Sequence, residues 1–467
     1  MPLPHTVARR KFLLGAGAAL GATAAVGLTR AGAAAATGVR RPGSRPNVLW
    51  IITDDQPRHT LPTMPRTWKR LVRRGVRFTR GNVAAPLCGP SRASMLTSMY
   101  VHNHGCQDNE TMAEFNGQGL DQDTIGTRMT QAGYTCGYFG KYMNGYSDSP
   151  TYVAPGWQRW VASLGTVSHE VNVAGRVRTV DMHVDQFATN QLKRWLKRRA
   201  TEAAPWFAVF APTNPHSDGW KVDSYGPSTE HEHDFDGVAW NPPALNEKDM
   251  RDKPSWMQDL PFQRRAKMRA AYEGKLEELQ DVDDQVNAIL NRLGKLGMLD
   301  NTWIFFVTDN GYMLGEHRLA KKETAYEECV GTPFVVTGPG VRQGSLSQKL
   351  VSTVDLMPTT LEVAGLDPEA GRPLDGRSLV GPLTTGDWSG WRTRMLTEHP
   401  LKSWAHLREG NTVLVDHYAA GEQEVYDMAA DPHQMSSLHA TTDTAAMTAR
   451  LTALRNASGR TLRALEM

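Results

Sequence analysis

The sequence predicts an α/β protein in which a large, mixed but mostly parallel β-sheet is sandwiched by helices, followed by a small antiparallel sheet. Residues 47–52, 206–210 and 302–307 are continuously apolar, which is typical of strands buried on both faces of a parallel sheet. From about residue 386 the pattern turns to shorter alternating segments, such as 412–415. That change indicates an antiparallel sheet in a C-terminal subdomain.

Length and composition frame the domain organisation. The chain has 467 residues, of which 40% are hydrophobic and 22% charged, so it can bury a large core. We predict a leader over residues 1–36, a linker over 37–46, a main domain over 47–385 and a subdomain over 386–467. After residue 36 there is neither a basic block nor a long apolar stretch. We therefore expect no nucleic-acid partner and no membrane anchor.

The leader resembles a twin-arginine (Tat) export signal. Arg9 and Arg10 precede a weakly apolar Ala/Gly-rich segment, and residues 31–36 supply an A-x-A end. The alternative, a transmembrane anchor, is disfavoured because the segment is only mildly hydrophobic. Without the leader the formal charge falls from +3 to −1, because four of the 52 basic and none of the 49 acidic residues lie in it. We expect export to the periplasm or the extracellular space.

Polar side chains directly follow two of the predicted strands. Asp54 and Asp55 come after the first strand, and Asp309 and Asn310 come after the strand at 302–307. In open α/β sheets ligand groups collect at the carboxyl ends of the strands. Carboxylate and amide oxygens suit Ca²⁺ or Mg²⁺, and not zinc or copper. Adjacent acids at one strand end could instead cap a helix and face solvent.

A second chemically distinctive stretch is the run Cys88-Gly89-Pro90-Ser91-Arg92. Pro90 suits the first turn of a helix, so we expect Cys88 at a helix N-terminus, where free N–H groups and the helix dipole favour an anion. Arg92, one turn further, adds a fork of donors suited to a tetrahedral oxyanion. Without these neighbours, Cys88 would simply be a small buried apolar residue.

The C-x-P-S-R pattern resembles the signature of the formylglycine-dependent sulfatases, a family with an alkaline-phosphatase-like fold. Matches to the family extend from Arg45 to Leu438. The resemblance implies that a maturation enzyme oxidises Cys88 to Cα-formylglycine, an aldehyde, which Tat export of the folded protein would permit. It also implies a bound divalent ion, usually Ca²⁺, whose ligands are Asp54, Asp55, Cys88, Asp309 and Asn310.

The same resemblance assigns two lysines to the sulfate group of a substrate. Lys141 follows the short strand predicted over residues 135–139, and Lys322 precedes the strand predicted over 333–336. Lys321 lies next to Lys322, so the second assignment is open by one position.

His216 lies in the Pro-His-Ser context where the family places the histidine that protonates the leaving oxygen. An isolated loop histidine is more often without such a role. Many sulfatases carry another histidine two residues after the first lysine, where this chain has Met143. Residues 139–146 and 154–157 resemble the glucosamine-6-sulfatase branch, which also lacks that histidine. Asn144 is a candidate to serve instead.

The reaction implied by the resemblance is hydrolysis of a sulfate monoester. The hydrated aldehyde at Cys88 attacks sulfur, His216 protonates the departing alcohol, and the second hydroxyl expels sulfate. We expect a sulfated small molecule or glycan as substrate and a formylglycine-generating enzyme as maturation partner. Two alternatives stay open. A phosphatase or phosphonate monoester hydrolase would use the same charges, and a catalytically dead protein would only bind sulfated glycans.

Two acidic patterns are given no catalytic role. Residues 231–234 (His-Glu-His-Asp) lie in a polar, Pro-rich stretch and are interpreted as a solvated loop. Residues 272–293 predict an amphipathic helix, whose Asp281, Asp283 and Asp284 are expected to face solvent or to cap neighbouring loops.

The three cysteines outside the motif, Cys106, Cys136 and Cys329, allow at most one disulfide. The lack of a C-x-x-C pattern argues against structural zinc. Two further helices are predicted, over residues 120–132 and 442–465.

Overall fold

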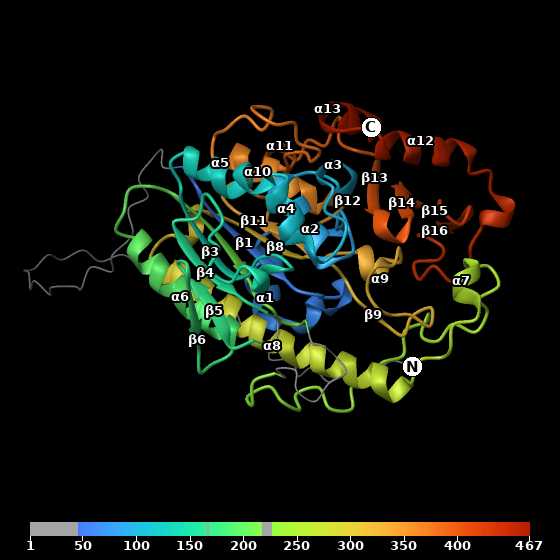
Figure 1. The fold of residues 1–467 in the computed structure, drawn as a ribbon, viewed down its shortest axis with the longest axis horizontal. Coiled ribbons are helices and arrows are strands. Elements are labelled where there is room, and N and C mark those ends of the chain that lie inside the picture. The colour runs from blue at the N-terminus through green and yellow to red at the C-terminus, as the bar shows by residue number, and fades with distance from the viewer. Residues whose placement is uncertain (1–44, 166–167, 217–226) are drawn as a thin grey trace, which may run out of the picture. The chain divides into compact units, whose positions relative to one another are not determined.

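The computed structural model describes residues 45–165, 168–216 and 227–467, and the predicted leader lies outside them. The largest element is a ten-stranded sheet with the order β12-β2-β11-β8-β1-β7-β3-β4-β5-β6 (Figure 1). Its strands are β1 (Asn47–Thr53), β2 (Val76–Asn82), β3 (Thr135–Lys141), β4 (Arg159–Ser163), β5 (Glu170–Val173), β6 (Arg176–Thr179), β7 (Trp206–Ala211), β8 (Thr302–Thr308), β11 (Phe334–Thr337) and β12 (Ser345–Ser352). Strand β1 is parallel to β7 and β8, β3 to β7 and β4, and β2 to β12. Strands β11 and β5 run antiparallel to both of their neighbours.

Helices cover both faces of this sheet, because its central strands are apolar on both sides. One layer consists of α1 (Pro65–Arg70), α6 (Val184–Arg199) and α8 (Arg265–Lys295). The other includes α2 (Cys88–Thr97), α5 (Ile125–Gln131) and α10 (Leu356–Val363). Alternate residues of β1 pack into the two layers, Leu49 and Ile51 into the first and Trp50 and Ile52 into the second. Figure 1 shows the sheet between these layers.

A separate antiparallel sheet follows, formed by β13 (Arg394–His399), β14 (Trp404–Glu409), β15 (Thr412–His417) and β16 (Glu422–Asp427). Its residues Leu407 and Leu414 share a core with Leu451 and Leu454 of helix α12 (Ala445–Arg455). The predicted fold class, a large mixed sheet between helices with a small C-terminal antiparallel sheet, is therefore confirmed. The domain boundary at residue 385 stays a prediction.

Two predicted helices differ from the observed ones near their N-terminal ends. The helix predicted over 272–293 is longer, since α8 begins at Arg265 and ends at Lys295. The helix predicted over 120–132 is divided into a short 3₁₀ turn and α5. Thr124 and Thr127 form a capping box, which satisfies the free N–H groups at the start of a new helix.

The final helix predicted over 442–465 is also divided, into α12 and α13 (Gly459–Leu465). The carbonyl of Ala457, between the two helices, accepts a hydrogen bond from Asn103 Nδ2 at 3.0 Å and lies 2.9 Å from His102 Nε2. These contacts attach the segment between α12 and α13 to helix α3 (Val101–His104), which is remote from it in sequence.

The prediction of a solvated loop over residues 231–234 is wrong for His231. This side chain is buried, with Nδ1 2.9 Å from Asp234 and Nε2 3.1 Å from Asp284 of α8. The imidazole therefore attaches the loop to α8 through Asp284, while Asp234 binds it from within the loop.

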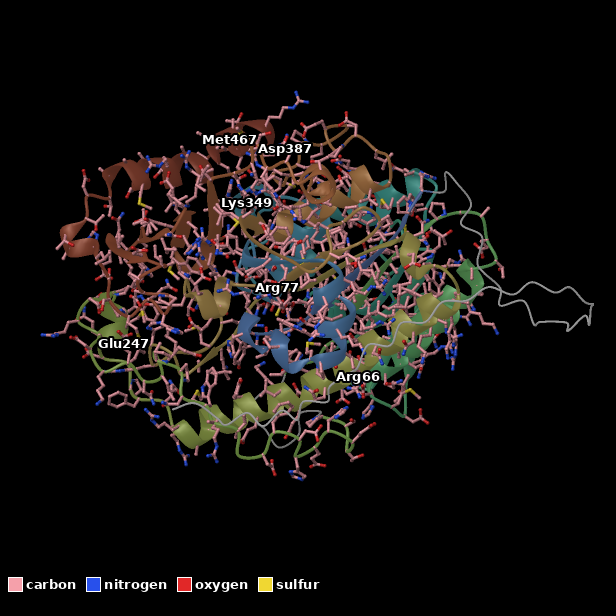
Figure 2. The ribbon with its side chains drawn as sticks, turned by 180° about the vertical axis from the view of Figure 1, so that it is seen from behind. Arg66, Arg77, Glu247, Lys349, Asp387 and Met467 are labelled. Atoms are coloured by element: carbon pink, nitrogen blue, oxygen red, sulfur yellow. The ribbon has the colours of Figure 1, made fainter. Side chains whose placement is uncertain are left out.

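The aspartates of α8 act mainly as caps, one of the two predicted alternatives. Asp283 is fully buried and accepts hydrogen bonds from the main-chain N–H groups of Arg66 and Thr67 at 2.9 and 2.6 Å. Figure 2 labels Arg66, which lies in the first turn of α1. Asp281 accepts hydrogen bonds from the N–H and hydroxyl of Ser228. The alternative that Asp283 faces solvent is wrong.

The four cysteines are buried and unpaired. Among the described residues we find no helix that combines the length and apolarity needed to cross a membrane. The remaining short elements include α4 (Thr111–Gly117), α7 (Ser255–Gln258), α9 (Glu327–Val330), α11 (Val380–Thr385), β9 (Met313–Leu314) and β10 (Ala320–Lys321).

Candidate functional site

Two adjacent parallel strands bring four polar residues to one edge of the sheet. Thr53 of β1 lies in register with Thr308 of β8, so the residues that follow them meet, as the sequence predicted. Asn310 Nδ2 donates a hydrogen bond to Asp55 Oδ1 at 2.6 Å. The N–H of Asp55 donates to Asp309 Oδ1 at 3.1 Å.

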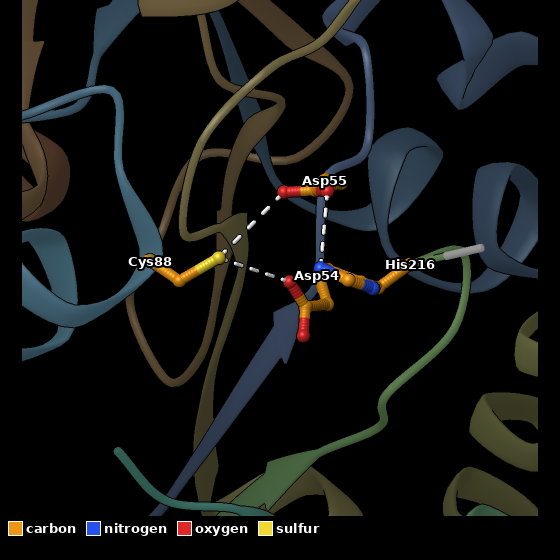
Figure 3. Close-up of side chains that lie close together, drawn as sticks. All are labelled: Asp54, Asp55, Cys88 and His216. Atoms are coloured by element: carbon orange, nitrogen blue, oxygen red, sulfur yellow. Dashed lines mark hydrogen bonds and ion pairs between the residues drawn. The ribbon is translucent and has the colours of Figure 1, made fainter. Parts of the chain in front are cut away.

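Cys88 occupies the first position of helix α2 and is fully buried. Its Sγ lies 3.5 Å from Asp54 Oδ1 and 3.7 Å from Asp55 Oδ1 (Figure 3). Burial and the nearby Asp309 raise the pKa of the Cys88 thiol above its ordinary value. The thiol therefore stays protonated at neutral pH, where it is a poor nucleophile.

Arg92 and Lys141 bind the carboxylates from the side of α2 and β3. Arg92 Nε lies 2.8 Å from Asp309 Oδ2, and its guanidinium also donates to the carbonyl of Lys141 at 2.7 Å. Lys141 Nζ lies 2.5 Å from Asp54 Oδ2. Burial alone would lower the pKa of Lys141, but the charge of Asp54 raises it overall, so the lysine remains a cation.

The structure distinguishes between the two adjacent lysines of the sequence prediction. Lys322 Nζ lies 2.7 Å from Asp55 Oδ1 and 2.6 Å from Cys88 Sγ. Lys321 is exposed. Lys322 is therefore the one that reaches the site.

His216 stands at the end of the turn that follows β7. Its Nε2 lies 3.6 Å from Asp55 Oδ2, and its buried Nδ1 has no hydrogen-bond partner among the described residues. Burial lowers the pKa of His216 to about 4, with Lys141 and Lys322 acting in the same direction and Asp55 opposing them. The side chains of His216 and Lys322 are 17% and 12% exposed, against 2% or less for Asp54, Asp55 and Arg92. A ligand would therefore approach from the side of His216 and Lys322.

The side chains of the site form a candidate metal-binding cluster. Ligand atoms of Asp54, Asp55, Cys88 and His216 lie within 4.8 Å of one another (Figure 3). The buried Oδ1 of Asn310 accepts no hydrogen bond from the described residues, which leaves it available to a cation. Sulfur is a soft ligand, and in this cluster Sγ stands where oxidation of Cys88 would place an oxygen.

Asp309 is not one of the four residues in that cluster. Its Oδ1 accepts hydrogen bonds from the N–H groups of Asp55 and Asn310, and its Oδ2 lies against Arg92. Each of its oxygens therefore already has a partner, although a carboxylate oxygen retains a further lone pair for a metal.

The charges of the site alternate in sign. Asp54 and Asp309 pair with Arg92, Asp54 also pairs with Lys141, and Asp55 pairs with Lys322. A divalent cation added to this set would leave an excess of positive charge, which is the condition for binding an anionic ligand.

Sequence reasoning missed one buried cation beside the site, Lys275 of α8. Its Nζ donates to the carbonyls of Pro215 at 2.7 Å and Asp55 at 3.4 Å. A signal was present, because Lys275 lies four residues from both Ala271 and Leu279, on the buried face of an amphipathic helix.

Met143 and Asn144 lie two and three residues after Lys141. Met143 is buried in the large core. The buried Oδ1 of Asn144 has no hydrogen-bond partner among the described residues. The assignment of Asn144 to an acid–base role stays a prediction.

Fold and site together define an α/β protein with a cluster of carboxylates, cations and one cysteine at the carboxyl ends of its central strands. The chain belongs to the sulfatase family, whose sequence model matches residues 46–366. A second model, N-sulphoglucosamine sulphohydrolase C-terminal, matches residues 315–458. The predicted family is thereby confirmed.

Individual relatives agree with this assignment. A putative extracellular sulfatase Sulf-1 homolog from Caenorhabditis elegans is 31% identical over 356 residues, which cover 72% of this chain and 49% of that protein. This chain thus spans about half the length of the nematode protein. N-acetylglucosamine-6-sulfatase from Homo sapiens is 28% identical over 384 residues, covering 78% of this chain and 68% of that protein. The predicted resemblance to that branch is thereby confirmed.

A solved structure described as a complex with its substrate D-glucosamine-2-N,6-O-disulfate shares the fold. The TM-score is 0.75 at 24% identity, with 88% of this chain and 97% of the solved chain covered. The likeness extends through the small antiparallel sheet, since the covered share exceeds that of the main domain alone.

Proposed function

We propose that this protein is an exported sulfatase that hydrolyses a sulfate monoester of a carbohydrate, using formylglycine formed from Cys88 and a bound Ca²⁺. The observation that carries the proposal is the position of Cys88 at a helix N-terminus, with Sγ 3.5 and 3.7 Å from two carboxylates and 2.6 Å from Lys322 Nζ. A protonated, buried thiol is a poor nucleophile. Oxidation to an aldehyde gives this residue a chemical role that the thiol lacks.

The proposed metal would be held by Asp54, Asp55, Asp309 and Asn310, with an oxygen in place of Sγ of Cys88. When present, Ca²⁺ withdraws charge from the nucleophile and the sulfate oxygens. The hydrated aldehyde supplies one hydroxyl as nucleophile and a second through which the sulfate is released. Mg²⁺ uses the same oxygen ligands with a stricter geometry.

The cations of the chain itself would bind and orient the sulfate group. Arg92 and Lys141 are held in place by Asp309 and Asp54, so they require little rearrangement when charge develops on the sulfate oxygens. Lys322 lies on the more exposed side of the site and is the third of these cations, next to Cys88. A phosphate or phosphonate ester presents similar oxygens, and the charge pattern does not separate these substrates.

His216 would protonate the leaving alcohol. Its pKa of about 4 applies to the site without substrate, where two lysines repel a proton. A bound sulfate ester places negative charge among these lysines, which raises the pKa of the imidazole. His216 thus becomes able to hold a proton when substrate is present, and it releases that proton to the leaving oxygen.

A sulfated sugar is the proposed substrate class, with 6-O-sulfated glucosamine as the first candidate. Support comes from the names of two relatives, an N-acetylglucosamine-6-sulfatase and an extracellular sulfatase homolog. Export by the Tat-type leader over residues 1–36, which lies outside the described residues, agrees with an extracellular glycan. Formylglycine-generating enzyme is the proposed partner during maturation.

The experiment that tests the proposal combines peptide mass with substrate preference. The tryptic peptide containing Cys88, taken from exported protein, should be lighter than the thiol form by about 18 Da, the difference between CH₂SH and CHO. The same protein should hydrolyse an aryl sulfate faster than the matching aryl phosphate, and Cys88→Ala should hydrolyse neither. A faster phosphate reaction would support a phosphatase. Glycan binding without hydrolysis by the modified protein would support a binding protein.

A further inference from the structure

We propose that Lys275 is a positioning residue that holds His216 against the metal-binding loop and so controls protonation of the leaving group. This inference rests on the proposed function of the same site. Lys275 lies on α8, opposite the sheet edge that carries the acids, and it is 1% exposed.

The ammonium group of Lys275 joins two loops of the site. Its Nζ donates to the carbonyl of Pro215 at 2.7 Å and to the carbonyl of Asp55 at 3.4 Å. Pro215 precedes His216, whereas Asp55 follows β1. The two loops are also joined directly, since the N–H of Asp54 donates to the carbonyl of Asn214 at 3.4 Å. Lys275 adds a side-chain bridge from a third element, next to His216 and the carboxylate 3.6 Å from it.

The aliphatic stem and the head of Lys275 are themselves held in place. Nζ lies 4.1 Å from the centre of the Tyr312 ring, a distance at which an ammonium and an aromatic face attract each other. The tyrosine follows the Asp309–Gly311 segment in sequence. Lys275 thus contacts three of the segments that build the site, those that follow β1, β7 and β8.

The turn before His216 is anchored differently at its two ends. At its start, the buried carboxylate of Asp185 accepts hydrogen bonds from the N–H groups of Thr213 and Asn214 at 2.7 and 3.0 Å. At its end, Pro215 has no N–H, and the N–H of His216 donates back to the carbonyl of Thr213 within the turn at 2.9 Å. The carbonyl of Pro215 is therefore the main-chain group of that residue which can bind another element. The Nζ of Lys275 donates a hydrogen bond to that carbonyl.

This anchoring matters because proton transfer is sensitive to position. A general acid must lie within hydrogen-bond reach of the leaving oxygen, and a misplacement of about 1 Å can cost roughly 100-fold in rate. The cost depends on the leaving group. A sugar alkoxide needs the proton, whereas a nitrophenolate leaves as a stable anion. A lysine that only supported the fold would affect both substrates equally.

The test uses Lys275→Met, which keeps the stem but removes the donors, in protein whose residue 88 has been converted. Glucosamine 6-sulfate and 4-nitrophenyl sulfate are the two substrates, and His216→Ala sets the full leaving-group effect. We expect kcat for the sugar sulfate to fall about 100-fold, kcat for the aryl sulfate to fall less than about threefold, and KM to change little. Lys275→Arg, which restores donors, should recover most of the loss.

Lys253 offers a matched control. It is also a buried lysine, its Nζ donates to the carbonyl of Met435 at 2.9 Å, and it lies 5.4 Å from the centre of the Tyr426 ring. Lys253→Met should leave the ratio of the two rates at its wild-type value.

The outcomes separate this inference from the proposed function. Equal losses on both substrates in Lys275→Met, or no loss, overturn the role of Lys275 while the sulfatase assignment stands. Absence of sulfate release by the modified wild-type protein overturns both. If Lys275→Met does not fold, Lys275→Gln, which retains one donor, should show the same selective loss at reduced size, and an unselective loss in that variant overturns the inference.

Discussion

Lys322 Nζ lies 2.6 Å from Cys88 Sγ and 2.7 Å from Asp55 Oδ1, although the three residues come from separate segments of the chain. The lysine follows β10, the cysteine begins α2, and the aspartate follows β1. One carboxylate thus fixes the cation that faces the nucleophile position, and the same carboxylate belongs to the candidate metal cluster. Under the proposed function, anion binding and metal binding would therefore be coupled through Asp55.

Replacing Lys322 by alanine should weaken turnover of a sulfate ester by about 100-fold, because one preorganised cation facing the transferred group is lost. Burial acts to lower the pKa of Lys322, but the charge of Asp55 raises it well above its ordinary value, so the residue is charged throughout the working range. Steady-state kinetics with an aryl sulfate measure the effect. Lys321→Ala is the control, since that side chain is exposed, and it should stay within about twofold of the wild type. The reverse ranking would contradict the assignment.

Removal of the metal should lower both stability and activity. Dialysis against a chelator should reduce the thermal unfolding temperature, and Ca²⁺ at about 100 times its Kd should restore about 2.7 kcal/mol. In Asp54→Asn the response should shrink, because one of the carboxylate ligands is neutralised.

A second carboxylate–histidine cluster provides the comparison for this metal experiment. Ligand atoms of Glu230, His231 and Asp284 also lie close together, but the imidazole is engaged by Asp234 and Asp284. Asp284→Asn should therefore retain the full Ca²⁺ response. Loss of the response in Asp284→Asn, with retention in Asp54→Asn, would locate the ion elsewhere.

Glu327 should make stability depend on pH in the acid range. It is buried between Arg58, at 2.8 Å, and Arg408. Burial would raise the pKa of Glu327, but the two arginines lower it from 4.5 to about 2. The unfolded chain therefore takes up this proton first as the pH falls, so the stabilisation is complete above pH 4.5 and is lost towards pH 2.

The variant Glu327→Gln isolates that contribution. It should cost about 3 kcal/mol at pH 7, because the buried Arg408 and the partly exposed Arg58 lose their counter-ion. Urea unfolding of both proteins between pH 7 and pH 3 measures the difference. The difference in the free energy of unfolding between wild type and variant should become smaller as the pH falls. A difference that does not change with pH would contradict the lowered pKa of Glu327.

Gly311 should tolerate no side chain. A Cβ at this position would lie 2.0 Å from the carbonyl oxygen of Glu328, a main-chain atom that cannot turn aside. Gly311→Ala should therefore destabilise the fold by about 1–3 kcal/mol and disturb the adjacent Asn310. Gly294→Ala in α8 meets nothing within 4 Å and should stabilise the helix by about 0.5–1 kcal/mol. Urea unfolding of both variants provides the measurement, and equal stabilities would contradict the steric argument.

Much of the fold was predictable because a buried strand appears in the sequence as a continuous run of apolar residues. The apolar runs at 47–52, 206–210 and 302–307 correspond to β7 and to the paired strands β1 and β8, each buried throughout. Parallel strands bring their carboxyl ends together, so the meeting of Asp55 with Asp309 also followed from the pattern. The position of Cys88 at the start of α2 followed from Pro90 two residues later.

Other features depended on contacts between segments that are far apart in the chain. The resemblance assigned Lys322 but left the choice between it and Lys321 open by one position. Only the path of the loop after β10 exposes Lys321 and directs Lys322 towards Cys88. The break in the C-terminal helix depends on Asn103 binding the carbonyl of Ala457. His231 is buried, and not exposed as predicted, because it packs against Asp284 of α8.

The sequence by itself determined which strands are buried, where they end, and which residue types stand at those ends. These features depend only on residues that are neighbours in the chain, namely an apolar run and the polar residues that directly follow it. The tertiary structure alone decided the partners, since a hydrogen bond depends on where separate elements pack. Lys275 illustrates the difference most clearly. Its place on the buried face of α8 was readable from spacing, but its contact with Pro215, 60 residues away, exists only in the packed molecule.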